Sequence, residues 1–448
     1  MASPICEPIH KMDLLSKAYA SPSSDEDGDG AAGGRFRHSN RLSRPPPKRA
    51  RPETSLPNTL LMPVFRRPSL PAEAPIPGSY ISKRQRAALA SNPTLPGPNP
   101  DSVVPSPGSL SDSDLPHSIL TALRRQAKSS VVSKQTHQSL SANLRGHVKS
   151  VNSLQWSKSH DFTAHLLASA GMDHTVRIWN VWSKGQKQAR VLNYHNAAVK
   201  DAKWSRQGLS LLSCGYDCMS RLVDVEKGTE TQVFKEDQFV EVVNFCPDNY
   251  NLFLSGGSKG QVKLWDIRTG TVVHEYVRSL GPILDAEFTV DGKYLITSSD
   301  VSKTNLSENS IIVWDVSRQI PLSNQVYAEA YTCPCIRRHP FEPYFIAQSN
   351  GNYIAIFSTK PPYKLDKYKR YEGHGVSGFP IKCNFSWDGN ILATGSYDGC
   401  IYFYDSKSTK FLKKVKAYEQ ACVDIAFHPT LSDVIASCSW NGEISVFD

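Results

Sequence analysis

A short strand-like motif recurs seven times in the last two thirds of the sequence, and it constrains the fold more than any other feature. In each copy an alternating apolar run ends in an aromatic or apolar residue, which in six copies is followed by Asp or Asn. These terminal pairs begin at residues 179, 223, 265, 314, 357, 404 and 447. The spacing of 42 to 49 residues allows each unit to form one small structure that packs against its neighbours.

Each repeat also carries a strand of small residues and a tight turn upstream of this motif. Clear examples are the segments 168–173, 212–217 and 393–398. Small residues allow neighbouring strands to approach, and Asp followed by Gly or His suits a chain reversal. Four short strands per unit and seven units predict an all-β, seven-bladed β-propeller, preceded by a long N-terminal tail.

A Gly-His or Tyr-His pair precedes several repeats, and together with the turn Asp and the terminal Trp it resembles the WD40-repeat family over residues 137–448. In that family a His, a strand Ser or Thr, the turn Asp and the Trp form a buried hydrogen-bonded tetrad in each blade. The resemblance assigns structural tetrads to blades one, two and six, at His147, Ser169, Asp173 and Trp179, at His195, Ser213 and Asp217, and at His374, Thr394, Asp398 and Tyr404.

The tetrad pattern is incomplete elsewhere. In blade two Val223 replaces the Trp. In the remaining four blades the Asp position holds Lys259, Glu308, Gly351 and Asn441. Those four blades are therefore expected to rely on packing alone.

A Ser, a His and an Asp in one place could also form a catalytic triad. We favour the structural interpretation, because the set recurs at fixed spacing and ends on a Trp that only a structural network needs. No nucleophile–base pair or phosphate-binding glycine loop stands out, so we expect no enzyme activity, no cofactor and no small-molecule substrate. Cys333, Cys335 and His339 have metal-ligand chemistry, but a structural zinc needs four ligands and no fourth lies nearby in the sequence.

The end of the sequence predicts how the propeller closes. Asp448 ends the third strand of blade seven, so the fourth strand of that blade is expected from upstream of blade one. Residues 138–144 have the apolar alternation for this role, and pairing there would remove an open sheet edge. The folded domain is therefore expected to span residues 137–448.

Composition divides the chain near residue 136. Residues 1–136 hold 20 of the 30 prolines and none of the eight tryptophans, with 18 Lys and Arg against 11 Asp and Glu. Such a segment cannot bury enough apolar surface to offset chain entropy, so a disordered basic tail is expected. The rest of the chain holds 33 basic and 31 acidic residues, which argues against nucleic-acid binding through bulk charge.

Three tail segments have candidate roles. An acidic serine cluster at 21–27 fits a kinase site or a solvated charge run, and residues 116–128 have the apolar spacing of a short docking helix. Lys48, Arg49 and Arg51 lie in a basic, proline-flanked run that fits a nuclear import signal, a nonspecific RNA contact or an idle charge run. We expect a nuclear protein, or one shared between nucleus and cytoplasm, and no apolar run is long enough to cross a membrane.

The residue before each turn Asp is expected on the top face of a propeller. In four blades that are contiguous around the ring this residue is large and apolar, at Met172, Tyr216, Tyr397 and Trp440. Grouped exposed aromatics are typical of protein-binding hot spots, although the same side chains could simply seal loops.

The residue order of several segments narrows the resemblance from WD40 repeats in general to two families. Residues 167–173, 263–270 and 371–374 resemble the propeller of the pre-mRNA-processing factor 17 family. Residues 331–334 and 347–353, the tail segment 80–86 and the acidic serine cluster are more similar to the WD repeat-containing protein 25 family. This resemblance implies a nuclear scaffold that assembles protein or ribonucleoprotein complexes in pre-mRNA processing, with RNA contacted indirectly or through the tail. Trp265–Arg268 has instead the Trp-Asp-x-Arg form of cullin-4 ubiquitin ligase receptors, which makes Arg268 a candidate contact to an adaptor protein, although Lys259 departs from the longer motif.

Overall fold

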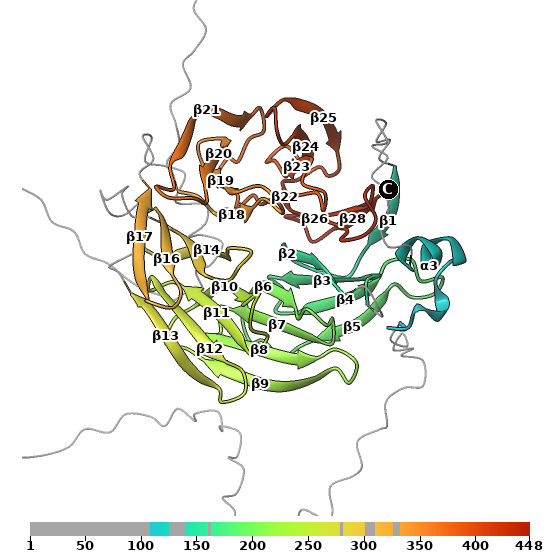
Figure 1. Ribbon diagram of the computed structural model, residues 1–448. Helices are drawn as coiled ribbons and strands as arrows, with labels where there is room; N and C mark the ends of the chain where they lie inside the picture. The colour runs from blue at the N-terminus through green and yellow to red at the C-terminus, as the bar shows by residue number, and fades with distance from the viewer. Residues whose placement is uncertain (1–107, 125–138, 160–162, 278–280, 301–309, 326–331) are drawn as a thin grey trace, which may run out of the picture. The chain divides into compact units, whose positions relative to one another are not determined.

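The computed structural model describes residues 108–124, 139–159, 163–277, 281–300, 310–325 and 332–448. Within these residues seven four-stranded antiparallel sheets are arranged as the blades of one propeller, which confirms the predicted fold class (Figure 1). Most of the chain preceding these blades, including the acidic serine cluster and Lys48, Arg49 and Arg51, lies outside the described residues.

The first six blades are meanders whose four strands follow sequence order. Blade one contains β2 (Val151–Trp156), β3 (Leu166–Gly171), β4 (Val176–Asn180) and β5 (Gln188–Leu192); blade two contains β6 (Val199–Trp204), β7 (Ser210–Gly215), β8 (Met219–Asp224) and β9 (Thr229–Lys235); blade three contains β10 (Val240–Phe245), β11 (Leu252–Gly257), β12 (Gln261–Asp266) and β13 (Thr271–Val277). Blade four contains β14 (Ile283–Phe288), β15 (Tyr294–Ser299), β16 (Ile311–Asp315) and β17 (Ile320–Gln325); blade five contains β18 (Cys335–Arg338), β19 (Tyr344–Ser349), β20 (Tyr353–Ser358) and β21 (Leu365–Glu372); blade six contains β22 (Cys383–Phe385), β23 (Ile391–Thr394), β24 (Cys400–Asp405) and β25 (Phe411–Lys416).

Blade seven is built from both ends of the domain. It contains β26 (Cys422–Phe427), β27 (Ile435–Ser439), β28 (Ile444–Phe447) and, as its outer strand, β1 (Leu140–Leu144). Leu144 lies opposite Ile444, and the backbones of Ser139 and Asp448 exchange hydrogen bonds of 2.9 and 3.1 Å. The segment expected to close blade seven thus pairs with β28, and it covers an edge that would otherwise expose unpaired backbone groups.

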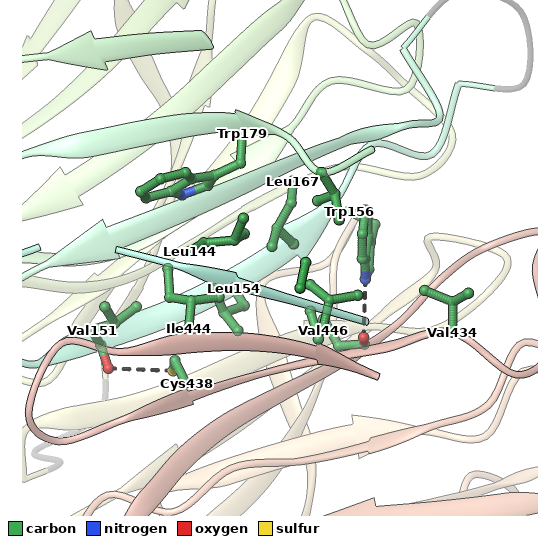
Figure 2. Packing of buried hydrophobic residues seen from close by; sticks show 14 of the residues in the cluster. Leu144, Val151, Leu154, Trp156, Leu167, Trp179, Val434, Cys438, Ile444 and Val446 are labelled. Atoms are coloured by element: carbon green, nitrogen blue, oxygen red, sulfur yellow. Dashed lines mark hydrogen bonds between the residues drawn. The ribbon is translucent and has the colours of Figure 1, made fainter. Parts of the chain in front are cut away.

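The inner strands are buried because each sheet is packed between two neighbouring blades. All six residues of β3 are buried, whereas the outer strand β13 is exposed at every second position. Figure 2 shows the packing between blades one and seven, where Trp156 donates a hydrogen bond from Nε1 to the Ala426 carbonyl at 3.1 Å. Trp204 donates in the same way to the Gln155 carbonyl at 3.0 Å. The Trp156 bond therefore links blade one to blade seven, and the Trp204 bond links blade two to blade one.

The turns between the second and third strands share one backbone feature. The residue that follows the turn Asp has a positive φ in blades one and two, at His174 (68°) and Cys218 (61°). Asn352 in blade five adopts the same conformation at 68°, and glycines do so in blades three, six and seven. Left-handed backbone reverses the chain within two residues, which lets these turns project a fixed side chain at the end of each blade.

A segment of the expected tail is folded against blade one. It contains the 3-10 helix η1 (Asp112–Asp114) and the helix α3 (His117–Arg124). Leu115 is buried, and the Asn180 side-chain amide donates to the carbonyls of Ser109 and Ser111, both at 3.1 Å. The domain described by the structure therefore includes residues 108–124, which composition alone assigned to the disordered tail. A Pro- and Ser-rich sequence can be ordered where a neighbouring surface provides hydrogen-bond partners for its backbone groups.

Candidate interaction surface

A buried hydrogen-bond chain supports the turn of blade one. His147 Nδ1 lies 2.9 Å from Asp173 Oδ2, and His147 Nε2 lies 2.7 Å from Ser169 Oγ. Trp179 donates from Nε1 to the same Ser169 oxygen at 2.8 Å. The Trp donates to the Ser hydroxyl, the Ser donates to the imidazole, and the imidazole donates to the carboxylate. This chain fastens the turn to the strands beneath it.

Burial sets the ionisation of this chain. Desolvation lowers the pKa of the His147 imidazole, in spite of the nearby Asp173 carboxylate. Burial would raise the pKa of Asp173, but hydrogen bonds from His147, Thr175 and the Val148 amide hold it well below its ordinary range. A neutral imidazole and a charged carboxylate are the states that satisfy every polar atom here.

Blade two repeats the arrangement without the indole. His195 Nδ1 lies 3.0 Å from Asp217 Oδ2, and His195 Nε2 lies 2.8 Å from Ser213 Oγ. Arg221 adds an ion pair to Asp217 at 3.3 Å. Buried Val223 occupies the position of the Trp.

Blade six differs from the tetrad that the family resemblance assigned to it. His374 Nδ1 is hydrogen bonded to the Tyr404 hydroxyl at 3.1 Å, and its Nε2 lies 2.8 Å from the amide nitrogen of Gln348 in blade five. Thr394 donates to the carbonyl oxygen of the same Gln348 side chain at 3.2 Å. The Tyr404 hydroxyl thus bonds the imidazole Nδ1 atom that the turn Asp bonds in blades one and two, and the Nε2 atom bonds to the neighbouring blade. Burial lowers the pKa of His374 to about 4.

Asp398 consequently has a different set of partners. It accepts hydrogen bonds from Lys414 Nζ at 2.8 Å, from the Tyr402 hydroxyl at 3.0 Å and from the Cys400 amide at 3.1 Å. The carboxylate therefore binds β25 and its own turn, and it forms no hydrogen bond with the His374 ring in the described part of the chain.

Two blades that lack the turn Asp still keep part of the network. Trp265 donates to Ser255 Oγ at 2.9 Å in blade three, and Trp314 donates to Thr297 Oγ1 at 2.9 Å in blade four. The expectation that these blades rely on packing alone was therefore wrong. The small hydroxyl residue ten or seventeen positions before each Trp was the sequence signal for these bonds.

The four residues predicted for the binding arc occupy equivalent backbone positions. Met172, Tyr216 and Trp440 each donate the backbone amide to the residue directly before the first strand of their blade, at 2.8 to 3.0 Å: Ser150, Ala198 and Ala421. Tyr397 donates at 2.9 Å to Gly375, in the loop that leads to β22. All four lie at the ends of the blades that carry the turns between second and third strands. We call this end of the propeller the turn face.

The four side chains differ in how much of their surface is exposed to solvent and could contact a partner. Tyr397 is 51% exposed, and its ring lies so close to Gly375 that a Cβ there would come within 2.4 Å of Cε1. Trp440 is half-buried and packs edge-on against Phe379, with ring centroids 5.3 Å apart. Met172 is also half-buried. Tyr397 thus offers free apolar surface, whereas Trp440 also takes part in packing between blades six and seven.

The turn face carries aromatic residues that sequence reasoning missed. Phe239, which is 50% exposed, lies beside the half-buried Tyr216 with ring centroids 5.4 Å apart. The Lys200 ammonium lies 5.2 Å from the centre of the Tyr216 ring. Phe239 and Phe379 occupy the loops that enter β10 and β22, so an apolar residue in the loop before each first strand was the available signal.

Arg268 lies at the start of the turn between β12 and β13. Its guanidinium forms a two-point contact with Asp266, from Nε to Oδ1 at 3.2 Å and from Nη2 to Oδ2 at 2.7 Å. The side chain is 66% exposed. The geometry matches an arginine that caps its own turn, with one face of the guanidinium open to solvent.

The cysteine and histidine cluster has structural contacts. Cys333 and Cys335 are buried, and the Cys335 thiol points to the Cys383 carbonyl at 3.8 Å. His339 Nδ1 accepts a hydrogen bond from the Glu342 amide at 2.8 Å, and Nε2 donates to the Gly389 carbonyl at 2.9 Å. Across the described ranges, no three His, Cys, Asp or Glu side chains are grouped in a way that could hold a metal. The helices in those ranges include none that is long and apolar enough to span a membrane.

Comparison with known proteins follows the blade pattern. The WD domain, G-beta repeat family matches residues 138–180, 186–224, 228–266 and 366–405, which correspond to blades one, two, three and six. Blades four, five and seven have the same four strands without a matched repeat.

Similarity to individual proteins covers more of the chain. WD repeat-containing protein 25 of Mus musculus is 36% identical over 376 residues, which cover 82% of this chain and 69% of that protein. Pre-mRNA-processing factor 17 of Homo sapiens is 30% identical over 307 residues, or 68% of this chain and 51% of that protein. The Saccharomyces cerevisiae factor of the same name is 26% identical over 310 residues, covering 66% of its length. The chain thus spans about half the length of the human factor.

Proposed function

Because this chain belongs to the WD40-repeat family, we propose that it is a non-catalytic scaffold that assembles pre-mRNA-processing or other ribonucleoprotein complexes in the nucleus. The observation that carries the proposal is the similarity to pre-mRNA-processing factor 17, which extends over 68% of the chain and so through most of the propeller. A propeller fold by itself supports many unrelated functions. The similarity to pre-mRNA-processing factor 17 is therefore the basis for proposing the cellular process, and the turn face is the basis for proposing how partners bind.

The turn face is the surface through which the scaffold binds its protein partners. Tyr216 presents its ring beside Phe239 on blades two and three, and Tyr397 presents a 51% exposed ring on blade six. Their backbone amides are hydrogen bonded to the Ala198 and Gly375 carbonyls, so the main chain that carries each ring is already fixed when a partner covers it. Pre-organised aromatic residues of this kind are the usual hot spots of protein interfaces.

The buried networks position this surface and take no part in chemistry. His147 and Asp173 have side-chain exposures of 0% and 4%, so a substrate could not reach them. The serine oxygen that would act as a nucleophile is already bonded to the Trp179 indole and to the imidazole. The geometry therefore supports a rigid binding platform.

Affinity purification tests this proposal. Tagged full-length protein is recovered from nuclear extract with and without nuclease, and its partners are compared with those of Tyr397→Ala and Tyr216→Ala. A hot-spot aromatic contributes about 2 kcal/mol, so each change should weaken partner binding about thirtyfold. Tyr250→Ala is the matched control, because this tyrosine is 47% exposed and lies in the loop between β10 and β11, at the opposite end of the strands.

Partners that belong to pre-mRNA-processing complexes, that resist nuclease and that are lost only in the turn-face variants would support the proposal. Recovery of a cullin-4 adaptor together with ubiquitin-ligase subunits would replace it with the receptor function. If every partner is released by nuclease and the turn-face variants behave as wild type, the chain is held in complexes through RNA and the scaffold proposal fails.

Nuclear residence is part of the same proposal. Lys48, Arg49 and Arg51 are the residues proposed to carry the import signal. Replacing all three with Gln in a fluorescent fusion should move the protein toward the cytoplasm. An unchanged nuclear signal would contradict the role of this segment in import.

A further inference from the structure

Positive charge is concentrated on two adjacent outer strands of the propeller. Residues 360–372 and 405–416, which include β21 and β25, hold ten Lys and Arg against three Asp and Glu, a net charge of +7. Residues 137–448 as a whole have a net charge of only +2, so the domain without these two segments has a net charge of −5. Figure 1 shows β21 and β25 as the outermost strands of neighbouring blades.

A bulge in β21 lifts part of this charge away from blade five. Ala355 pairs with Arg370 and Phe357 pairs with Leu365, so one residue of β20 lies opposite four residues of β21. Asp366 stabilises the bulge by accepting hydrogen bonds from the amides of Tyr368 and Lys369, at 2.9 and 3.2 Å. A bulge in an outer strand re-aims its side chains, and here it presents residues 366–369 to solvent.

Tyr368 is the most exposed large hydrophobic side chain of the described propeller. Its exposed fraction is 98%, and Lys367 and Lys369 flank it in the sequence. An aromatic ring this exposed has almost no packing role, so removing it should leave the fold intact. A flat ring between two cations offers a stacking surface beside sites for negative charge.

A cleft of about 580 Å³ adjoins the bulge between blades five and six. Its walls include Ile356 and Leu365. Its charged lining consists of the cationic Lys364, Lys369 and Lys407 and the acidic Glu342 and Asp366, so lysines outnumber carboxylates by one. The Tyr344 and Ser406 hydroxyls, also lining the cleft, lie 3.2 Å apart. A space of this size with apolar walls and a few polar groups is large enough for a small planar ligand.

Three lysines at the cleft and the bulge have no ion-pair partner in the described ranges. Among the residues that the structure describes, Lys364, Lys367 and Lys407 form no ion pair with an acidic side chain. Lys414, toward the other end of β25, is in contrast paired with Asp398 at 2.8 Å. Lysines without acidic partners keep their attraction for an external anion.

We propose that the cleft between blades five and six, with the β21 bulge, binds single-stranded RNA. Lys364, Lys367 and Lys407 contact phosphates, Tyr368 stacks on one base, and the cleft accepts a second base. Stacking on an aromatic ring beside a basic track is how proteins hold single strands without sequence preference. The choice of RNA rests on the proposed function in pre-mRNA processing, whereas the single-stranded form follows from the exposed ring and the cleft.

The test measures binding of a fluorescent 20-nucleotide uridine oligomer to the full chain by anisotropy over a range of salt concentrations. Loss of three phosphate contacts in Lys364→Gln/Lys367→Gln/Lys407→Gln should reduce the slope of log affinity against log salt by about 2. Tyr368→Ala should bind at least about fivefold more weakly, while Tyr368→Phe should match wild type because it keeps the ring. Double-stranded RNA should compete poorly because its bases are already stacked.

Matched controls separate this surface from bulk charge and from the tail. Lys227→Gln/Lys259→Gln/Lys293→Gln removes the same charge from blades two, three and four and should leave binding unchanged. Ultraviolet crosslinking should label peptides containing residues 364–369. Melting curves of all variants should coincide with wild type, because the altered side chains are exposed.

Three results would overturn the inference. The cleft variants could bind as wild type while Lys48→Gln/Arg49→Gln/Arg51→Gln loses binding, which assigns RNA to the tail. The control lysines could matter equally, which means bulk charge. A polyglutamate peptide could displace RNA while Tyr368→Ala binds normally, which identifies an acidic protein segment as the partner. In each case nuclease-resistant partners at the turn face would still uphold the proposed scaffold.

Discussion

Asp173 and Asp398 occupy the same position of their repeats, yet the structure predicts that their removal has different costs. Asp173 has a side chain only 4% exposed and accepts hydrogen bonds from His147, from Thr175 at 2.8 Å and from the Val148 amide at 3.2 Å. Hydrogen bonds to a charged group contribute about 1.5 to 3 kcal/mol each, and an orphaned buried donor costs about 1 to 3 kcal/mol. Because these terms overlap, Asp173→Ala should lower the free energy of unfolding by about 3 to 4 kcal/mol.

Asp398 should contribute less. Its main charged partner, Lys414, is 44% exposed, and an exposed ion pair contributes about 0.2 to 1 kcal/mol. The Tyr402 and Cys400 bonds can be replaced by water, since the Asp398 side chain is 26% exposed. Asp398→Ala should therefore lower the free energy of unfolding by about 1 kcal/mol.

Urea unfolding with double-mutant cycles measures both costs. The His147–Asp173 cycle should give a coupling energy of about 1 to 3 kcal/mol, as expected for residues in one hydrogen-bond network. The cycle between His374 and Asp398 should give less than about 0.5 kcal/mol, because no hydrogen bond joins them. Equal single-variant costs together with strong coupling in blade six would refute the network described for that blade and restore the family's tetrad.

Three further predictions follow from the same contacts. Removal of residues 1–107 should leave the melting temperature near that of the full chain. Removal of 1–134 should lower it, because buried Leu115 and the Asn180 bonds are lost, and removal of 1–146 should lower it much further, because β1 leaves blade seven; equal melting of all three truncations would contradict the closure. Burial lowers the pKa of His374 from 6.5 to about 4, so the unfolded chain takes up this proton first as the pH falls. The contribution of neutral His374 to the free energy of unfolding is therefore fully present above about pH 6.5. It is lost as the pH falls from about 6.5 to about 4, and the total loss is up to about 3 kcal/mol. His374→Gln should flatten the dependence of the melting temperature on pH in that range, and an unchanged profile would exclude His374 as its source. Arg268→Ala should leave both the stability and the partners of the chain unchanged, because the arginine only caps its turn; selective loss of a cullin-4 adaptor would establish the receptor function instead.

Part of the candidate surface could be predicted from the sequence and part could not. The positions of Tyr216 and Tyr397 at the turn face followed from the turn that comes after them, because a turn is a local property of a few residues. The half-burial of Trp440 could not be predicted, since it depends on Phe379 in a loop 61 residues upstream. The segments 360–372 and 405–416 each have a positive net charge that can be counted in the sequence, but the near-neutral net charge of the whole domain conceals it.

The number of blades, their strand content and the closing strand are determined by the sequence itself. Each depends on the alternation of apolar strand residues and turn residues, which occurs in every repeat. Which groups meet across blades was decided by the tertiary structure. His374 binds Gln348 of blade five although a nearby Asp398 was available, and residues 108–124 are ordered because Asn180 of blade one donates hydrogen bonds to their backbone carbonyls. The cleft likewise lies between two adjacent blades, whereas the β21 bulge lies in the pairing of β21 with β20 inside blade five. Local periodicity is encoded within each repeat, whereas contacts between repeats depend on side-chain size and on the geometry of packing, which no single repeat contains.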